Sequence, residues 1–284
     1  MSTIIRTRRD FLKQSMYVGA AVVAAGPLGR VLAQSSAGPG SKMKFGLVTY
    51  LWGRDWDLPT VIANCEKTNV LGVELRTEHA HGVESNHSAQ ERREVKKRFD
   101  DSPVTLLGPG TNFAFHHADA AKLRSDIEGA KEYIKLSKDI GGTGVKVKPN
   151  DLPKDVPQEK TIEQIGKSLN ELGRFGADYG QKIRLEVHGA CSPLPIIKKI
   201  MDIADHPNVG VCWNSNQSDL DGAGFDHNFD LVKDKIFSVH LRDVYLEEYP
   251  VSVEFLGSLE NVYDLFGAAL EPEQVFFLKN LRIE

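Results

Sequence analysis

Two short motifs end in side chains that could bind a metal ion or move a proton. The first is the run LEVHG at residues 185–189, and the second is SVHLRD at residues 238–243. In each, an apolar run of the kind found in strands buried on both faces reaches a carboxylate or an imidazole where the strand should end. The carboxyl ends of barrel strands converge on one mouth. We therefore expect Glu186 and His240 to meet there, as candidates for one divalent-metal site.

The elements that must position these residues alternate along the chain. Apolar runs predict strands at residues 44–51, 71–76, 104–107, 145–147, 183–187, 209–213 and 236–241. Amphipathic patterns predict helices at 57–69, 88–99, 119–140, 161–179, 195–204 and 229–233. Such alternation favours a parallel sheet, and an eighth repeat would close a (β/α)8 barrel. A doubly wound open sheet is the alternative, although no Gly-x-Gly-x-x-Gly motif follows the first strand.

The ends of several elements carry recognisable signals. Asp57 is expected to cap its helix, and Ser88 with Glu91 fits a capping box, as does Thr161 with Gln164. The run GPGTN at 108–112 is expected to be a loop after the third strand. Beyond Pro250, residues 253–270 are expected to form a helix and 274–278 an eighth strand. The barrel is then either closed by this short strand or left incomplete.

The first residues have the pattern of a twin-arginine (Tat) export signal. Arg8 and Arg9 precede Phe11-Leu12-Lys13 and an apolar stretch at about 16–28, and small residues follow at the cleavage positions 31–33. We expect residues 1–33 to be a Tat signal, 34–43 a linker, and 44–284 one domain of a periplasmic or exported protein. The apolar stretch is shorter than the ~20 residues of a membrane span, so no stable span is expected after cleavage. An uncleaved anchor is the alternative.

The net charge and the cysteine content argue against two kinds of partner, nucleic acid and a cysteine-bound zinc ion. Loss of residues 1–33 removes five basic and one acidic residue and changes the net charge from −4 to about −8. An acidic surface opposes nonspecific binding to nucleic acid, so no nucleic-acid partner is expected. The three cysteines have no zinc-site spacing. Cys65 and Cys212 are expected to be small buried hydrophobic residues. Homo-oligomer formation stays open.

Three motifs in order resemble one known family. LEVHG, VGVCWN at 209–214 and VHLRD at 239–243 make the chain similar to the xylose isomerase-like TIM barrel superfamily, over about residues 44–243. That group includes sugar phosphate isomerases and epimerases and the endonuclease IV-like enzymes. The resemblance implies a (β/α)8 barrel with a divalent metal, Mn²⁺, Mg²⁺, Co²⁺ or Zn²⁺, held by residues on strands five to eight.

The resemblance assigns roles residue by residue. Glu186 matches the strand-five metal ligand and His240 the strand-seven ligand, while Asn214 stands where the family has an aspartate on strand six. An asparagine brings a carbonyl oxygen but no charge. The strand-eight glutamate has no match. Because the family's two glutamates also move the substrate proton, Glu186 is the expected catalytic base.

The implied function is a metal-dependent sugar or sugar phosphate isomerase or epimerase. It would transfer a proton within a small sugar substrate through an enediolate that the metal stabilises. A noncatalytic or degenerate carbohydrate-binding barrel is the alternative, favoured by the missing strand-eight ligand. An endonuclease IV-like phosphodiesterase is the third reading, which the acidic charge disfavours.

Five other residues are expected to contact the substrate. His188 faces the same way as Glu186 on an extended strand. Arg242 is a candidate for a phosphate or carboxylate group, and Trp52 for stacking on a sugar face. Lys148, or its neighbour Lys146, could bind an oxyanion at the mouth. His79 follows the second strand and could line the same mouth.

Each assignment has a structural alternative. Glu186 could be an ion-pair partner, His240 a satisfied core histidine, and Asn214 a loop cap. His188 could be structural, Lys148 could pack its stem on the exterior, and Trp52 could belong to the core. Glu74 and Arg76 are expected to form a salt bridge at the barrel rim rather than to take part in the site.

Overall fold

The structure, a computed structural model, describes residues 44–50, 53–241 and 275–278. The expected export signal and linker lie outside these residues, as do Trp52, Arg242 and the expected helix at 253–270. Within the described part, no helix combines the length and apolar character that a membrane crossing requires. The described residues from 44 onward belong to one compact unit.

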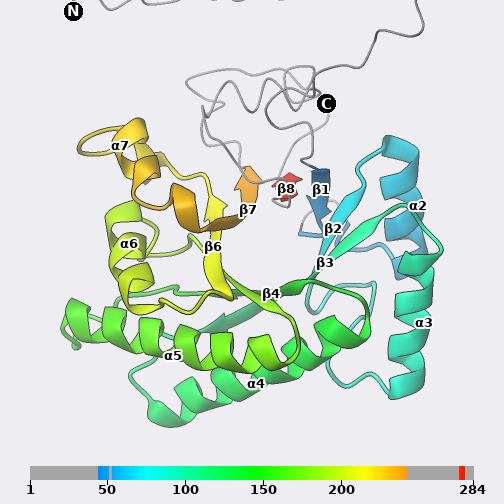
Figure 1. The fold of residues 1–284 in the computed structure, drawn as a ribbon, viewed down its shortest axis with the longest axis horizontal. Coiled ribbons are helices and arrows are strands. Elements are labelled where there is room, and N and C mark those ends of the chain that lie inside the picture. The colour runs from blue at the N-terminus through cyan, green and yellow to red at the C-terminus, as the bar shows by residue number, and fades with distance from the viewer. Residues whose placement is uncertain (1–43, 51–52, 242–274, 279–284) are drawn as a thin grey trace, which may run out of the picture. The chain divides into compact units, whose positions relative to one another are not determined.

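Eight parallel strands close into a barrel in which each strand pairs with the next one in sequence and β8 pairs with β1 (Figure 1). The strands are β1 Lys44–Val48, β2 Gly72–Arg76, β3 Thr105–Ala114, β4 Gly144–Lys148, β5 Lys182–Glu186, β6 Val209–Asn214, β7 Ile236–Leu241 and β8 Val275–Leu278. The expected (β/α)8 fold is thus confirmed. The short eighth strand closes the barrel, so the open-sheet alternative is wrong.

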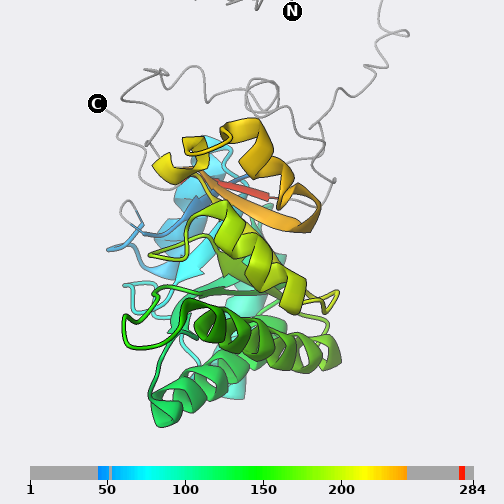
Figure 2. The ribbon, with the colours of Figure 1, turned by 90° about the vertical axis from the view of Figure 1, so that its left-hand side faces the viewer.

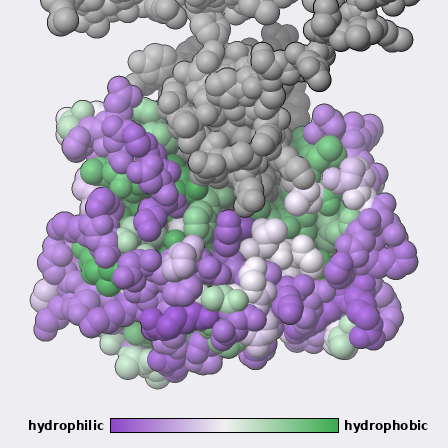
Figure 3. Space-filling view, in the orientation of Figure 1, coloured by the Kyte–Doolittle hydropathy of each residue, from purple (hydrophilic) through white to green (hydrophobic). Residues whose placement is uncertain are grey.

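Helices follow the strands and cover the outside of the barrel (Figure 2). They are α2 Leu58–Thr68, α3 Ala89–Asp100, α4 Ala120–Asp139, α5 Gln158–Asp178, α6 Leu194–Ile203 and α7 Phe225–Asp230, with short 3-10 helices η2 Gln217–Leu220 and η3 Lys233–Lys235. Their apolar sides pack on the strands in a single large core that includes Leu169, Leu172 and Val209. On the face shown in Figure 3, hydrophilic residues cover most of the surface over α4 and α5.

Two of the three expected helix starts match the structure. Asp57 accepts a hydrogen bond from the backbone of Thr60, and Ser88 forms the expected capping box with Glu91. The third expectation is wrong, since α5 begins after Pro157 and Thr161 lies buried inside the helix. Proline disfavours helical backbone before it and fits a helix start, so the chain enters the helix three residues earlier than the polar pattern indicates.

The expected loop at 108–112 is also wrong, because β3 continues through it to Ala114. Gly108 has a φ of 135°, and a Cβ there would lie 1.9 Å from the carbonyl oxygen of Gly144. Glycine therefore allows β3 to approach β4 closely at this point. A Gly-Pro-Gly run usually marks a turn, and here pairing with β2 on one side and β4 on the other keeps it extended.

Candidate functional site

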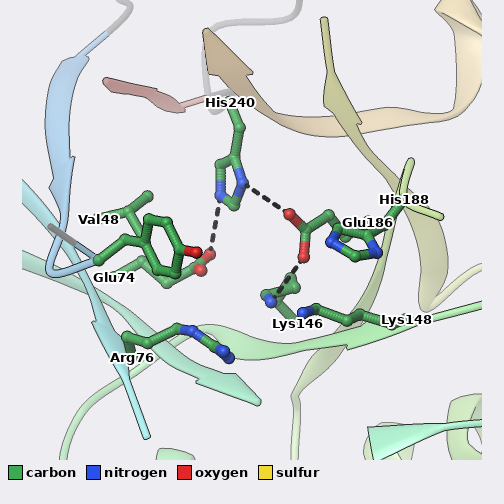
Figure 4. Close-up of a pocket in the computed structure, with 9 residues that line it drawn as sticks. Val48, Glu74, Arg76, Lys146, Lys148, Glu186, His188 and His240 are labelled. Carbon is green, nitrogen blue, oxygen red and sulfur yellow. Dashed lines mark hydrogen bonds and ion pairs between the residues drawn. The ribbon is translucent and has the colours of Figure 1, made fainter. Parts of the chain in front are cut away.

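A cavity of about 60 Å³ opens at the carboxyl ends of the strands. Its walls come from five different strands or the residues that follow them (Figure 4): Val48, Tyr50, Glu74, Arg76, Lys146, Lys148, Glu186, His188 and His240. Most of these side chains are polar or charged. This is the end of a (β/α)8 barrel where active sites lie.

Glu186 is the last residue of β5, and its side chain is fully buried. The register pairs Lys146 of β4 with Arg184, so Glu186 lies one pleat further along the same face of the sheet. Lys146 Nζ donates a hydrogen bond to Glu186 Oε2 at 2.7 Å, and the amide nitrogen of Asn214 donates to Oε1 at 3.2 Å. A buried carboxylate is costly unless it is paired, and here both oxygens are engaged.

His240 lies between two buried carboxylates (Figure 4). Its Nε2 is 3.3 Å from Glu74 Oε2, and its Nδ1 is 3.7 Å from Glu186 Oε1. Burial alone would lower the pKa of the imidazole, but the Cys212 sulfur, the Glu74 carboxylate and the contact with Glu186 raise that pKa well above its usual value. His240 is therefore expected to carry a positive charge between the two acids.

Glu74 of β2 is a member of the site that the sequence reasoning missed. The expected rim salt bridge with Arg76 is wrong: Glu74 is 1% exposed and contacts His240 across the barrel. Burial raises the pKa of its carboxyl, but His240 and Lys146 outweigh that effect and hold the pKa below its usual value. Gly110 makes room for the side chain, since a Cβ there would lie 2.4 Å from Glu74 Oε1.

The outer wall of the cavity carries several polar groups. His188 Nδ1 lies 3.0 Å from the side-chain oxygen of Asn150, which holds the ring in place. Lys148 Nζ donates to Asn112 Oδ1 at 2.9 Å. Both side chains line the cavity as the sequence reasoning expects. Figure 4 shows Lys148 and Arg76 below the Glu186–His240 cluster.

His79 lines a second, larger cavity of about 240 Å³ rather than the first. The two cavities share Tyr50 and Arg76, and the larger one is also bordered by Arg54. Burial and the nearby Arg76 lower the pKa of His79, which favours its neutral form. A ligand longer than the first cavity could extend along this side of the mouth.

Two further histidines, His81 and His117, have structural contacts. His81 Nε2 lies 2.7 Å from the carbonyl oxygen of Arg76 and holds the turn after β2. His117 Nε2 lies 3.0 Å from the buried carboxylate of Asp126 in α4. Cys65 and Cys212 are buried, as expected.

The donor set does not fit the divalent metal that the sequence resemblance implies. The Lys146 ammonium already contacts Glu186, and both nitrogens of His240 face carboxylates. Asn214 presents its amide nitrogen, not its oxygen, to Glu186. Across the described residues, no group of three or more His, Cys, Asp or Glu side chains is arranged to hold a metal ion.

Comparison with known proteins supports the fold. One similar structure is that of IolI protein with a binding zinc atom. Its TM-score is 0.64 at 19% sequence identity, and the match covers 83% of this chain and 88% of the IolI chain. L-ribulose 3-epimerase has a TM-score of 0.65 at 14% identity, covering 83% of this chain and 80% of its own. The 3-keto-D-glucoside 4-epimerase YcjR from E. coli has a TM-score of 0.63 at 13% identity, covering 85% of this chain and 94% of its own.

These identities establish a shared fold and no more. The comparison with curated proteins found no match. The family model described as "Xylose isomerase-like TIM barrel" matches residues 62–256, which is more than half of the chain. The protein therefore belongs to the xylose isomerase-like TIM barrel family.

Proposed function

We propose that the protein is an isomerase or epimerase that moves a proton within a small sugar or sugar phosphate through an enediolate. The observation that carries the proposal is the placement of the Glu186 carboxylate on the wall of the mouth cavity, 2.7 Å from one ammonium and 3.7 Å from one imidazole. A base can remove a proton next to a carbonyl, and two neighbouring cationic groups can stabilise the oxyanion that results.

In this proposal Glu186 takes the proton from the carbon next to the substrate carbonyl. His240 and Lys146 supply positive charge toward the oxygen that becomes negative, in a site largely shielded from water. Asn214 keeps the carboxylate oriented through its hydrogen bond to Oε1. No step depends on a metal ion, because the donor set does not fit one.

A group on the other side of the substrate must return the proton when the reaction inverts a carbon centre. The family's strand-eight glutamate has no counterpart in β8, whose sequence is VFFL. Glu74 lies on the opposite side of His240 from Glu186 and is the candidate for this second role. In a simple isomerisation Glu186 can carry the proton from one carbon to its neighbour, while a second proton passes from the hydroxyl oxygen to the former carbonyl oxygen so that the carbonyl forms at the adjacent carbon.

The wall residues suit an oxygen-rich substrate. His188 and Lys148 line the cavity and are proposed to contact substrate oxygens. His79, in the adjoining cavity, is proposed to contact a more distant part of the substrate. Arg242 and Trp52 remain proposals from the sequence, as an anion partner and a stacking surface. Two of the similar structures are sugar epimerases, which supports a sugar as the substrate class.

Deuterium exchange tests the proposal directly. The purified protein is incubated in D₂O with a panel of ketoses, aldoses, 3-keto sugars and their phosphates, and proton NMR follows loss of the C–H signal next to the carbonyl. We expect exchange with at least one substrate, reduced at least ~100-fold by Glu186→Gln, in line with the loss of a general base.

Glu163→Gln is the matched control, because Glu163 lies on the outside of α5 and pairs with Lys167. It should exchange at the wild-type rate. Saturable binding of a sugar without any deuterium exchange would overturn the proposal. That result would favour the carbohydrate-binding alternative.

We also propose that residues 1–33 direct export through the Tat pathway to the periplasm. The paired Arg8 and Arg9 ahead of an apolar stretch support this. Replacing both by lysine should leave the protein in the cytoplasmic fraction. Periplasmic recovery of that variant would contradict the proposal.

A further inference from the structure

A charge that a metal ion would bring is already present in the site as a side chain. Lys146 and Glu186 are 3% and 0% exposed, and their charged atoms lie 2.7 Å apart. The ammonium also donates to the carbonyl oxygen of Thr111 at 3.0 Å. Two partners hold Nζ in one place, so Lys146 is an ordered part of the wall.

A divalent cation bound to Glu186 would be repelled by the ammonium of Lys146. Metal–oxygen distances are about 2 Å, so an ion on the carboxylate would lie within a few Å of Nζ. The repulsion is poorly screened at a buried position. Either the lysine would have to lose its proton or its side chain would have to leave Glu186 and the Thr111 carbonyl oxygen.

The neighbouring donors are also arranged for hydrogen bonding. Register pairs Asn214 of β6 with His240 of β7, so both side chains reach the Glu186 carboxylate from the same side of the barrel. Asn214 presents a donor to that carboxylate, and His240 has a carboxylate against each nitrogen. Each ring nitrogen of His240 therefore faces a carboxylate, at 3.3 Å for Nε2 and 3.7 Å for Nδ1.

The eighth strand supplies no further acid. The segment 275–278 reads VFFL, and backbone pairing sets Phe277 opposite His240. Strand β8 therefore brings no carboxylate to the cluster that Glu74, Glu186, Asn214 and His240 form among the described residues.

We propose that the ammonium of Lys146 replaces the divalent metal in this barrel, so that the site takes its substrate, a hydroxy-carbonyl compound, without a metal ion. Lys146 then supplies the fixed positive charge that binds the carbonyl oxygen and stabilises it as it becomes an oxyanion. This inference rests on the proposed function for the identity of the substrate but not for the statement about metal.

The first experiment measures metal in the wild-type full-length protein. After equilibration with Mn²⁺, Co²⁺ or Zn²⁺ and desalting, we expect well under one ion per chain by mass spectrometry. The melting temperature should not depend on these metals or on EDTA. One ion per chain that is lost in Glu186→Gln and in His240→Asn would overturn the proposal.

The second experiment removes the ammonium and restores the acid. The double variant Lys146→Met with Asn214→Asp should bind one Co²⁺ per chain, seen as visible d–d absorption. Lys148→Met with Asn214→Asp is the matched control, because Lys148 belongs to the same strand and cavity but hydrogen-bonds Asn112. The control should bind no Co²⁺.

A folded Lys146 double variant that binds no Co²⁺ would overturn the claim that Lys146 excludes the metal. Circular dichroism checks the fold, and Lys146→Gln, which keeps a donor near Glu186, replaces Lys146→Met if the first variant does not fold. Failure of the proposed function gives a different result: no sugar would show deuterium exchange, whatever the metal measurements show. Conversely, exchange that persists in EDTA supports both proposals.

Discussion

Lys146 on β4 and Glu186 on β5 form a buried ion pair, with Nζ 2.7 Å from Oε2, at the carboxyl ends of adjacent strands. The pair lies at the position where the family resemblance implies a divalent metal ion. Buried pairs gain little over an apolar replacement, but breaking one leaves a charge in a poor solvent. This asymmetry makes the pair both a stability determinant and a test of the site.

Lys146→Met should destabilise the protein by about 3–5 kcal/mol, because Glu186 loses its ammonium partner while buried. The free energy of unfolding is measured by urea denaturation. Adding Glu186→Gln to Lys146→Met should recover part of the loss, since the uncompensated charge disappears. Glu186→Gln alone is the second single variant. If the unfolding free energies lost in the two single variants add up to the loss in the double variant, the two residues are not energetically coupled and the interpretation is wrong.

Gly108→Ala should destabilise the protein by about 3 kcal/mol or more. A Cβ there would lie 1.9 Å from the backbone oxygen of Gly144, and the φ of 135° is unfavourable for a side chain. Gly222→Ala is the control, because it has a positive φ of 62° but nothing within 4 Å of the added Cβ. It should cost only about 1–2 kcal/mol. Equal losses in thermal unfolding would contradict the close approach of β3 and β4.

Stability should fall as the pH rises above 9, in part because of Cys65. Burial raises the pKa of this thiol from 9.0 to about 11. Between these values the unfolded chain releases the proton and the folded chain keeps it, so the contribution present below pH 9 is lost toward pH 11. The loss amounts to at most about 2–3 kcal/mol. Cys65→Ala should make the unfolding free energy fall less steeply between pH 8.5 and 10.5; an unchanged slope would exclude this cause.

Lys148→Met should raise KM about 10-fold for an anionic substrate and change kcat little, because Lys148 lines the outer wall and not the Glu186 cluster. Steady-state kinetics with the substrate found by deuterium exchange provide the measurement. Lys167→Met, on the exposed side of α5, should leave both constants unchanged. A fall in kcat at constant KM would instead place Lys148 among the groups that act on the transition state.

Much of the barrel could be predicted from local patterns. Seven apolar runs in alternation with amphipathic segments indicate parallel strands covered by helices, and each described strand lies within a few residues of its expected place except β3. β3 was expected to end at residue 107 because glycine and proline usually stop a strand. Pairing with both neighbours outweighs that local preference, and such pairing is not visible in the segment itself.

Local sequence patterns predicted only part of the candidate site. Glu186 and His240 stand out because each interrupts or ends an apolar strand, and the structure brings them within 3.7 Å. Glu74 interrupts β2 in the same manner, but the nearby Arg76 offered a local partner that made a rim salt bridge the simpler prediction. Its actual partner is 166 residues away in sequence.

The sequence alone determined the alternation of strands and helices, the end of the barrel to which Glu186 and His240 belong, and the absence of an acidic residue in the eighth strand. Those properties depend on local hydrophobic periodicity and on residue identity. Two contacts became visible only in the folded chain: Lys146 neutralises Glu186, and Glu74 reaches His240 across the barrel. The physical reason is that closure of the sheet sets which inward side chains meet, and a buried charge must then pair with whichever opposite charge that closure brings within reach.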